Sequence, residues 1–350
     1  MQTHMKRIHL FILTVLQLLA VFASAALASE KLTLIHPGPA GSLYEISALE
    51  FARRVEEKLP EPYTIEVTTN PGLGDSLSLL NSVKNGRATF ALTSSGLVAL
   101  SDTFAIFEMP FLFRSREQIR AIREALLEPY LEPAAQKQGL HILGVWENGF
   151  RHFTNDDHEI RTPEDFIGLK IAAPPANVWR LRLLRAYGAE PVPMSSREFA
   201  HALDTTSVNG QEAPLLQIAS LNLPEMQHYL SLSDHLYSPA FLVTGSLTFQ
   251  ELPPEIQTLI ADEAKNMESW IQQIAIRVES DLVDRLDQSM QMSHINRAAF
   301  VNASRPIYSE FMAAVPDGAK MIAAVKSYPL IEADSVKLFL HSGRAEDANK

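Results

Sequence analysis

The feature that most constrains the fold is an alternation of strand and helix patterns near the N-terminus. Apolar runs at 32–35 and 88–92 and an alternating pattern at 64–68 are typical of short strands, and apolar residues at helical spacing fill both intervals between them. This order predicts a βαβαβ unit built on a parallel sheet. Ligands of open α/β sheets bind beyond the carboxyl ends of the strands, where the loops 36–42 and 93–96 follow.

A second series of strands and helices begins at 141–145, and the 350 residues suit two domains of ordinary size. A strand at 169–173 stops at two prolines, and the helix that follows, 177–187, ends at Gly188. The apolar run 241–244 predicts a strand that returns to the first domain. We assign the chain to these segments: domain I, 29–149 with about 240–275; domain II, 150–239 with about 276–335; and a C-terminal tail, 336–350.

A long segment after residue 252 carries apolar residues three and four apart as far as Met290. This spacing predicts one continuous helix, and at 1.5 Å per residue it reaches roughly 55 Å, far enough to brace both domains. The same stripe also suits a coiled-coil dimer, but it mixes Ala and Met with Ile instead of keeping a strict seven-residue repeat. We therefore expect a monomer.

Composition and charge exclude several classes of function. The formal charge is −11, which argues against nucleic acid or an anionic membrane surface as the partner, because both attract clusters of Lys and Arg. The absence of cysteine excludes thiol catalysis and cysteine-based metal sites. The sequence lacks Gly-x-Ser-x-Gly, and its histidines lack the His-Glu-x-x-His spacing, so we expect no catalytic residues, no metal and no cofactor. A periplasmic hydrolase is the less favoured alternative.

Residues 1–28 have the features of a secretory signal. Two basic residues precede an apolar run over 8–22, and Ala26-Leu27-Ala28 offers a cleavage site of small residues. We therefore expect cleavage before Ser29 and a location in the periplasm. An uncleaved membrane anchor is the alternative, because the apolar run approaches the length of a spanning helix.

Short motifs between residues 32 and 312 are weak singly, but their order is specific in combination. They are Leu73-Gly74, Met109-Pro110-Phe111-Leu112-Phe113, Gly149-Phe150-Arg151, Thr162-Pro163-Glu164-Asp165, Gly168-Leu169-Lys170-Ile171, Gly188-Ala189 with Pro193-Met194, Val208-Asn209-Gly210-Gln211-Glu212 and Leu252-Pro253. In this order the chain resembles the solute-receptor subunit of TRAP transporters, the tripartite ATP-independent periplasmic carriers of organic acids.

The resemblance implies a two-domain α/β fold of the periplasmic-binding-protein type, with mixed sheets, a hinge and the long helix bracing both domains. It also implies a receptor that closes on a small solute in the cleft and hands it to the membrane subunits of a sodium-driven TRAP permease. A ligand-sensing subunit of a signalling or chemotaxis system uses the same fold and is the alternative function.

Two positions depart from the pattern that the resemblance implies. Ala172 stands where these receptors usually carry an Arg that clamps the ligand carboxylate, and Ala213 stands where they usually carry a supporting Asn. Arg151 matches a further arginine that often reaches the carboxylate, although it also suits a hinge ion pair with Glu212 or Glu147. We therefore expect an atypical site, which binds either a monocarboxylate through Arg151 alone or a neutral or amine-bearing solute.

The predicted ligand-binding residues come from strand ends, loops and aromatic side chains around this site. They are Arg151, Phe150, Trp146, His36, Tyr44, Thr93, Ser94, Ala172, Pro174, Trp179, Glu212, Ala213 and Tyr237. For a neutral or amine-bearing solute, we expect the two tryptophans of this set to line the cleft together with Tyr44 and Glu212.

Overall fold

The computed structural model describes residues 30–69, 76–94, 96–204 and 207–328. The predicted leader, the Leu73-Gly74 motif and the predicted C-terminal tail lie outside these ranges. No helix within them is long and apolar enough to cross a membrane.

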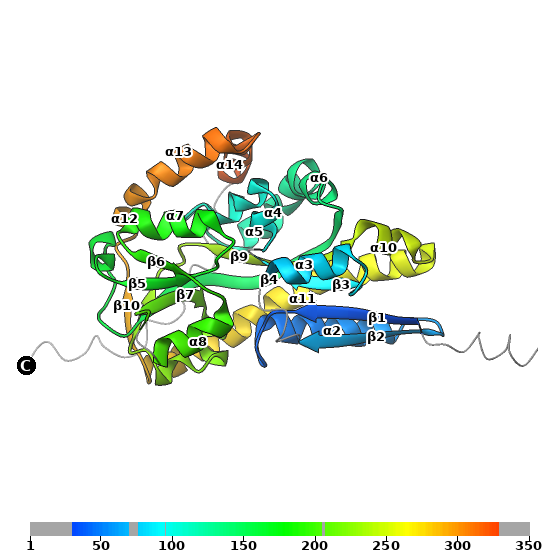
Figure 1. The fold of residues 1–350 in the computed structure, drawn as a ribbon, viewed down its shortest axis with the longest axis horizontal. Helices are drawn as coiled ribbons and strands as arrows, with labels where there is room; N and C mark the ends of the chain where they lie inside the picture. The colour runs from blue at the N-terminus through cyan, green and yellow to red at the C-terminus, as the bar shows by residue number, and fades with distance from the viewer. Residues whose placement is uncertain (1–29, 70–75, 95, 205–206, 329–350) are drawn as a thin grey trace, which may run out of the picture.

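The chain folds around a sheet that mixes parallel and antiparallel pairs (Figure 1), which confirms the predicted α/β class with mixed sheets. The main path runs β2-β1-β3-β9-β4-β7-β5-β6, while β8 pairs with β4 and β10 pairs with β8. β1 pairs in parallel with β2 and β3, as the N-terminal alternation predicts, and β9 returns antiparallel between β3 and β4. The strands are β1 (Glu30–His36), β2 (Tyr63–Thr69), β3 (Phe90–Thr93), β4 (Leu140–Asn155), β5 (Lys170–Ala173), β6 (Glu190–Pro193), β7 (Gly210–Pro214), β8 (Tyr229–Leu232), β9 (Tyr237–Gly245) and β10 (Gln291–His294).

Helices cover both faces of the sheet (Figure 1). On one face α3, α5, α7, α12, α13 and α14 contribute to a single large core, and on the other face α2 packs against α11. The helices are α2 (Leu43–Glu56), α3 (Ser76–Lys84), α4 (Gly96–Leu100), α5 (Arg116–Leu126), α6 (Glu132–Gln136), α7 (Val178–Tyr187), α8 (Ser196–Asp204), α9 (Leu215–Ser220), α10 (Ser246–Glu251), α11 (Pro254–Asp287), α12 (Arg297–Ala303), α13 (Arg305–Ala314) and α14 (Gly318–Ser327). The short helical turns are η2 (Asp102–Glu108), η3 (Leu127–Leu131), η4 (Pro163–Phe166) and η5 (Leu223–Glu225).

Helix α11 is continuous over 34 residues, as the apolar stripe predicts. Its N-terminal half buries Ile260 and Met267 in the core that contains Leu34 of β1. Its C-terminal half buries Leu282 and Leu286 in a separate core around α8 and β7. One helix therefore braces both parts of the sheet, which are β2-β1-β3-β9 on one side of β4 and β7-β5-β6 on the other.

Strand β4 belongs to both parts of the sheet and has a bulge at its middle. Residues up to Phe150 pair with β9, and those from Arg151 onward pair with β7, with a register shift between Glu147 and Gly149. Gly149 has a φ of +116°, and a Cβ there would lie 3.0 Å from the Oε1 atom of Glu279. The positive φ thus favours glycine at this position. The bulge turns the strand just before Arg151.

Candidate functional site

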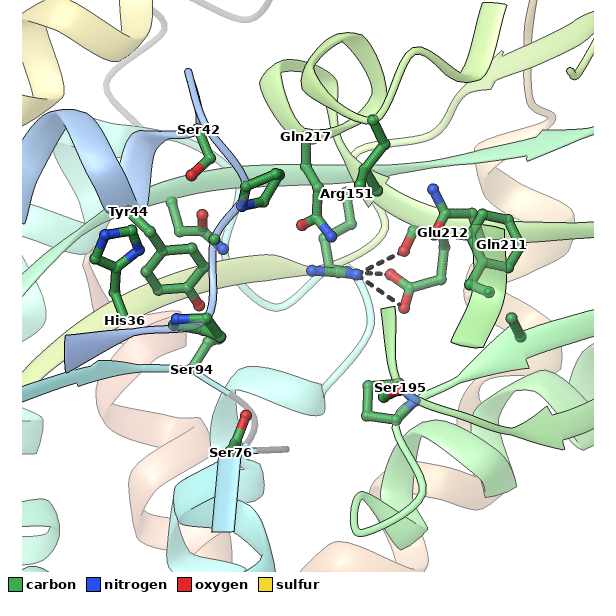
Figure 2. A pocket seen from close by; sticks show the side chains of 18 of the residues that line it. His36, Ser42, Tyr44, Ser76, Ser94, Arg151, Ser195, Gln211, Glu212 and Gln217 are labelled. Atoms are coloured by element: carbon green, nitrogen blue, oxygen red, sulfur yellow. Dashed lines mark hydrogen bonds and ion pairs between the residues drawn. The ribbon is translucent and has the colours of Figure 1, made fainter. Parts of the chain in front are cut away.

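A cavity of about 380 Å³ opens between the loop that follows β1, the middle of β4 and β7, and the end of β5 (Figure 2). The lining also includes His36 and Ser94, at the carboxyl ends of β1 and β3, where the N-terminal βαβαβ unit predicts ligands. Predicted residues that line the cavity are His36, Tyr44, Ser94, Arg151, Ala172, Pro174 and Glu212. Predicted residues that do not line it are Thr93, Trp146, Phe150, Trp179, Ala213 and Tyr237.

The two predicted tryptophans serve the core. The indole N–H of Trp146 donates to the carbonyl of Ala264 on α11 at 2.8 Å. The indole N–H of Trp179 donates to Asp102 at 2.8 Å, and its ring packs against Phe311. Neither indole lines the cavity, so the expectation of a tryptophan-lined cleft for a neutral or amine-bearing solute has no support from these residues.

The remaining residues outside the cavity are also packed in the core. Thr93 is fully buried, Ala213 lies in the core with α11, and Phe150 packs edge-on against Tyr237. The Tyr237 hydroxyl donates to Glu147 at 3.2 Å. Burial raises the pKa of Tyr237 well above its usual value, and Glu147 raises it further, so this phenol remains protonated.

Arg151 projects into the cavity and is also ion-paired with Glu212 (Figure 2). Its strand and that of Glu212 are antiparallel neighbours, which brings the two side chains together. The Nη2 atom of Arg151 donates to the Glu212 carbonyl at 2.5 Å and to its Oε1 atom at 3.1 Å, while Nε donates to Oε2. The Nη1 atom has a longer contact, 3.4 Å, with the Ser238 hydroxyl. Of the two partners considered for a hinge ion pair, Glu212 is the one used, and Glu147 pairs with Arg116 instead.

A second arginine, Arg180 of α7, lines the same cavity and was not predicted. It is only 3% exposed. Its Nε atom donates to Glu108 at 2.7 Å, and its Nη1 atom donates to Oε1 of Glu212. Glu212 therefore bridges the buried guanidinium of Arg180 and the partly buried guanidinium of Arg151. The helix pattern places Arg180 among leucines and further arginines, so no motif distinguishes the one arginine that faces inward.

Two uncharged polar side chains at the cavity have unused hydrogen-bonding atoms. Within the described ranges, both ring nitrogens of His36 and the side-chain nitrogen of Gln211 are buried without a partner. Burial lowers the pKa of His36, although Glu45 acts in the opposite direction, so the imidazole is neutral and offers one donor and one acceptor. A buried polar atom without a hydrogen-bond partner lowers the stability of the folded chain, and a bound polar molecule would supply such a partner.

The phenol of Tyr44 lies beside Arg151 and Ser94 at the cavity wall (Figure 2). Burial raises its pKa to about 12, although Arg151 and Ser94 act in the opposite direction. The hydroxyl is therefore a neutral hydrogen-bonding group. The site thus combines guanidinium groups with neutral polar groups, and within the described residues no three His, Asp or Glu side chains are grouped to hold a metal ion.

A family profile described as bacterial extracellular solute-binding protein, family 7, matches residues 35–314, which is most of the chain. The chain belongs to this family. The family 7 receptor is therefore a solute-binding protein of the TRAP type and not an enzyme, as the order of motifs predicts.

Relatives of the family 7 receptor include binding proteins of known ligand. It is 26% identical over 313 residues to the 2,3-diketo-L-gulonate-binding periplasmic protein YiaO of Escherichia coli, covering 88% of this chain and 94% of that protein. It is 26% identical over 310 residues to the sialic acid-binding periplasmic protein SiaP of Vibrio cholerae, covering 88% and 95%. A TRAP periplasmic solute binding protein from Polaromonas sp. JS666, solved with D-erythronate, matches with a TM-score of 0.80 at 28% identity, covering 87% of this chain and 100% of that one.

Buried histidines of the family 7 receptor predict how its stability depends on pH. Burial lowers the pKa of His36, His152 and His235 below the usual 6.5. As the pH falls below that value, the unfolded chain binds protons that the folded chain does not bind. We expect the free energy of unfolding to decrease by up to about 1.4 kcal/mol per pH unit for each histidine. Urea unfolding at pH 7.5, 6.5 and 5.5 measures this decrease.

His235→Phe is the matched variant, because the ring of His235 stacks on Phe153 with centroids 4.0 Å apart and a phenyl ring preserves that packing. We expect the variant to lose one histidine's share of the pH dependence. An unchanged slope would contradict this assignment. The lowest pH of the measurement is 5.5 because Glu147 has an opposite effect at lower pH. Burial raises the pKa of Glu147 from 4.5, so its protonation stabilises the folded chain as the pH falls.

Proposed function

We propose that the receptor binds a small hydroxylated monocarboxylate in the cavity, in the periplasm, and delivers it to the membrane subunits of a TRAP permease. The observation that carries this proposal is the guanidinium of Arg151 at the cavity wall, with its Nη1 atom held by no contact shorter than 3.4 Å among the described residues. A planar guanidinium with free N–H groups favours a carboxylate as its partner.

The balance of charge around Arg151 supports a ligand with one carboxylate. Arg151 and Arg180 face Glu212 and Glu108, so the two cations are matched by two anions. Ala172 adds only a methyl group to the same wall. A ligand carboxylate therefore depends on the N–H groups that these ion pairs leave unused, and a second carboxylate would find fewer of them and would lose its hydration without compensation.

The opposite part of the cavity supports a hydroxylated ligand. His36 and Ser94 present neutral hydrogen-bonding atoms there, and Gln211 presents a further one beside Glu212 (Figure 2). Both ring nitrogens of His36 and the side-chain nitrogen of Gln211 lack partners within the described residues. Hydroxyl or keto groups match such atoms better than a hydrocarbon chain does. D-erythronate, named for the Polaromonas receptor, and 2,3-diketo-L-gulonate, named for the Escherichia coli protein, both have this character.

Isothermal titration of the mature protein tests the ligand class. We expect D-erythronate, L-gulonate or pantoate to bind with micromolar or lower Kd, and succinate to bind at least about a hundredfold more weakly, a difference of about 2.7 kcal/mol. In a thermal-shift assay, an acid at a hundred times its Kd is expected to stabilise the protein by about 2.7 kcal/mol. Submicromolar binding of succinate would contradict the proposed class.

Delivery to a permease is tested separately. Uptake of the bound acid into vesicles that contain the permease subunits is expected to require the receptor and a sodium gradient. Binding without any receptor-dependent uptake would favour the sensing function instead.

A further inference from the structure

Arg180 is a buried cation on a helix whose other inward positions are apolar. It is 3% exposed, whereas Leu181, Leu183 and Leu184 of the same helix fill the core around it. Burying a guanidinium costs several kcal/mol unless its charge and N–H groups are matched. A leucine would pack at this position without that cost, so the arginine is better explained by what it faces, which is the cavity.

Glu108 holds Arg180 in a defined orientation. One oxygen of Glu108 accepts from Arg180 Nε at 2.7 Å, and the other accepts from the side chain of Asn177 at 2.8 Å. Asn177 is the N-cap of α7, and its side chain accepts the backbone N–H of Arg180 at 3.1 Å. The first turn of α7 is thus fixed to the end of η2, and Arg180 is fixed with it.

Arg180 and Arg151 converge on Glu212 from a helix and from a strand. The Oε1 atom of Glu212 accepts from both guanidinium groups, and Oε2 accepts from Arg151. Two guanidinium groups carry more N–H donors than one carboxylate can accept. Arg180 uses Nε and Nη1, so within the described residues its Nη2 atom remains for a further acceptor.

We propose that Arg180 is a specificity-determining residue that binds the ligand carboxylate together with Arg151, and that Glu108 positions it. This inference rests on the proposed function, because it requires an anionic ligand. Arg180 of α7 then supplies the cation that Ala172 of β5 does not supply, at the wall of the same cavity. The competing interpretation is a purely structural ion pair between η2, α7 and β7.

Titration of Arg180→Gln with D-erythronate, L-gulonate and pantoate is the first test. We expect the acids that bind the wild-type protein to bind this variant at least about 30-fold more weakly. Arg185→Gln is the matched control, because Arg185 lies on the same helix with an exposed side chain. It is expected to bind as the wild type does.

A variant that carries the arginine on β5 instead of α7 distinguishes a ligand-binding role of Arg180 from a structural role. In the double variant Arg180→Gln with Ala172→Arg, we expect at least about a tenfold recovery of affinity over Arg180→Gln alone, because one charge–carboxylate contact is restored. A structural ion pair between η2, α7 and β7 would not be rebuilt by an arginine on β5. Absence of any recovery would therefore overturn the inference.

The possible failures are distinguishable. If the wild-type protein binds none of the three acids, the proposed function fails and the inference fails with it. If the wild type binds and Arg180→Gln binds equally well, the inference alone is overturned. Should Arg180→Gln not fold, Arg180→Lys and Glu108→Gln retain the charge or the shape, and each is expected to weaken binding by about tenfold. Wild-type affinity in both would overturn the inference.

Discussion

Arg151→Ala is expected to weaken binding of a hydroxylated monocarboxylate by roughly 30-fold to several thousandfold. Removing one partner of a buried charge pair costs about 2 to 5 kcal/mol, and Arg151 lies at the wall of the cavity with N–H groups directed toward it (Figure 2). We also expect the variant to lose ligand-induced closure. Calorimetry measures the affinity, and small-angle scattering with and without D-erythronate measures the closure.

Arg151→Lys is the matched variant for this prediction. It keeps the charge beside Glu212 but lacks the planar fork, so we expect intermediate affinity. Unchanged affinity in Arg151→Ala would remove this residue from the ligand site and leave it as an ion pair of the sheet.

Glu212→Ala is expected to lower the free energy of unfolding by about 3 to 5 kcal/mol, because it leaves buried charge without its partner. Glu212 is only 3% exposed, and its carboxylate faces both Arg151 and Arg180. Without it, two guanidinium groups remain buried with one anion between them. Urea unfolding of the ligand-free protein measures the loss.

Two further variants show whether the loss of stability in Glu212→Ala comes from the carboxylate that joins the two arginines. Glu212→Gln keeps one acceptor oxygen and the side-chain volume, so we expect a smaller loss than for alanine. Glu66→Gln removes the carboxylate of an exposed ion pair with Lys31, whose side chains are 55% and 50% exposed, and such pairs contribute at most about 1 kcal/mol. A loss in Glu212→Ala no larger than in Glu66→Gln would contradict the bridging role.

Much of the fold is predictable because its determinants are local. The spacing of apolar residues predicts the N-terminal βαβαβ unit and the long helix, and Gly188 ends α7 with a left-handed conformation at a φ of +100°. The bulge before Arg151 is not predictable in this way. It arises where β4 passes from one set of partner strands to another, and that depends on contacts between distant segments.

The site is predictable only in part, for a related reason. The parallel sheet places His36 and Ser94 at strand ends and the motif order singles out Glu212, and all three line the cavity. Trp146 and Trp179 have the chemistry of ligand contacts, but the packing of helices against the sheet directs both into the core. Arg180 lines the cavity although no sequence motif indicates it. Only the packing of α7 against η2 distinguishes it from the other arginines of that helix.

The bulge of β4 at Gly149 has a consequence for the order in which ligand contacts form. Any bend of the chain at this glycine would act as a pivot, and atoms near a pivot travel much less than atoms far from it. Arg151 lies just beyond Gly149, whereas His36 lies on the loop that follows β1. If the receptor closes on the proposed ligand by such a bend, we expect the guanidinium to capture the carboxylate while the cavity is open, and the hydroxyl groups to be recognised afterwards.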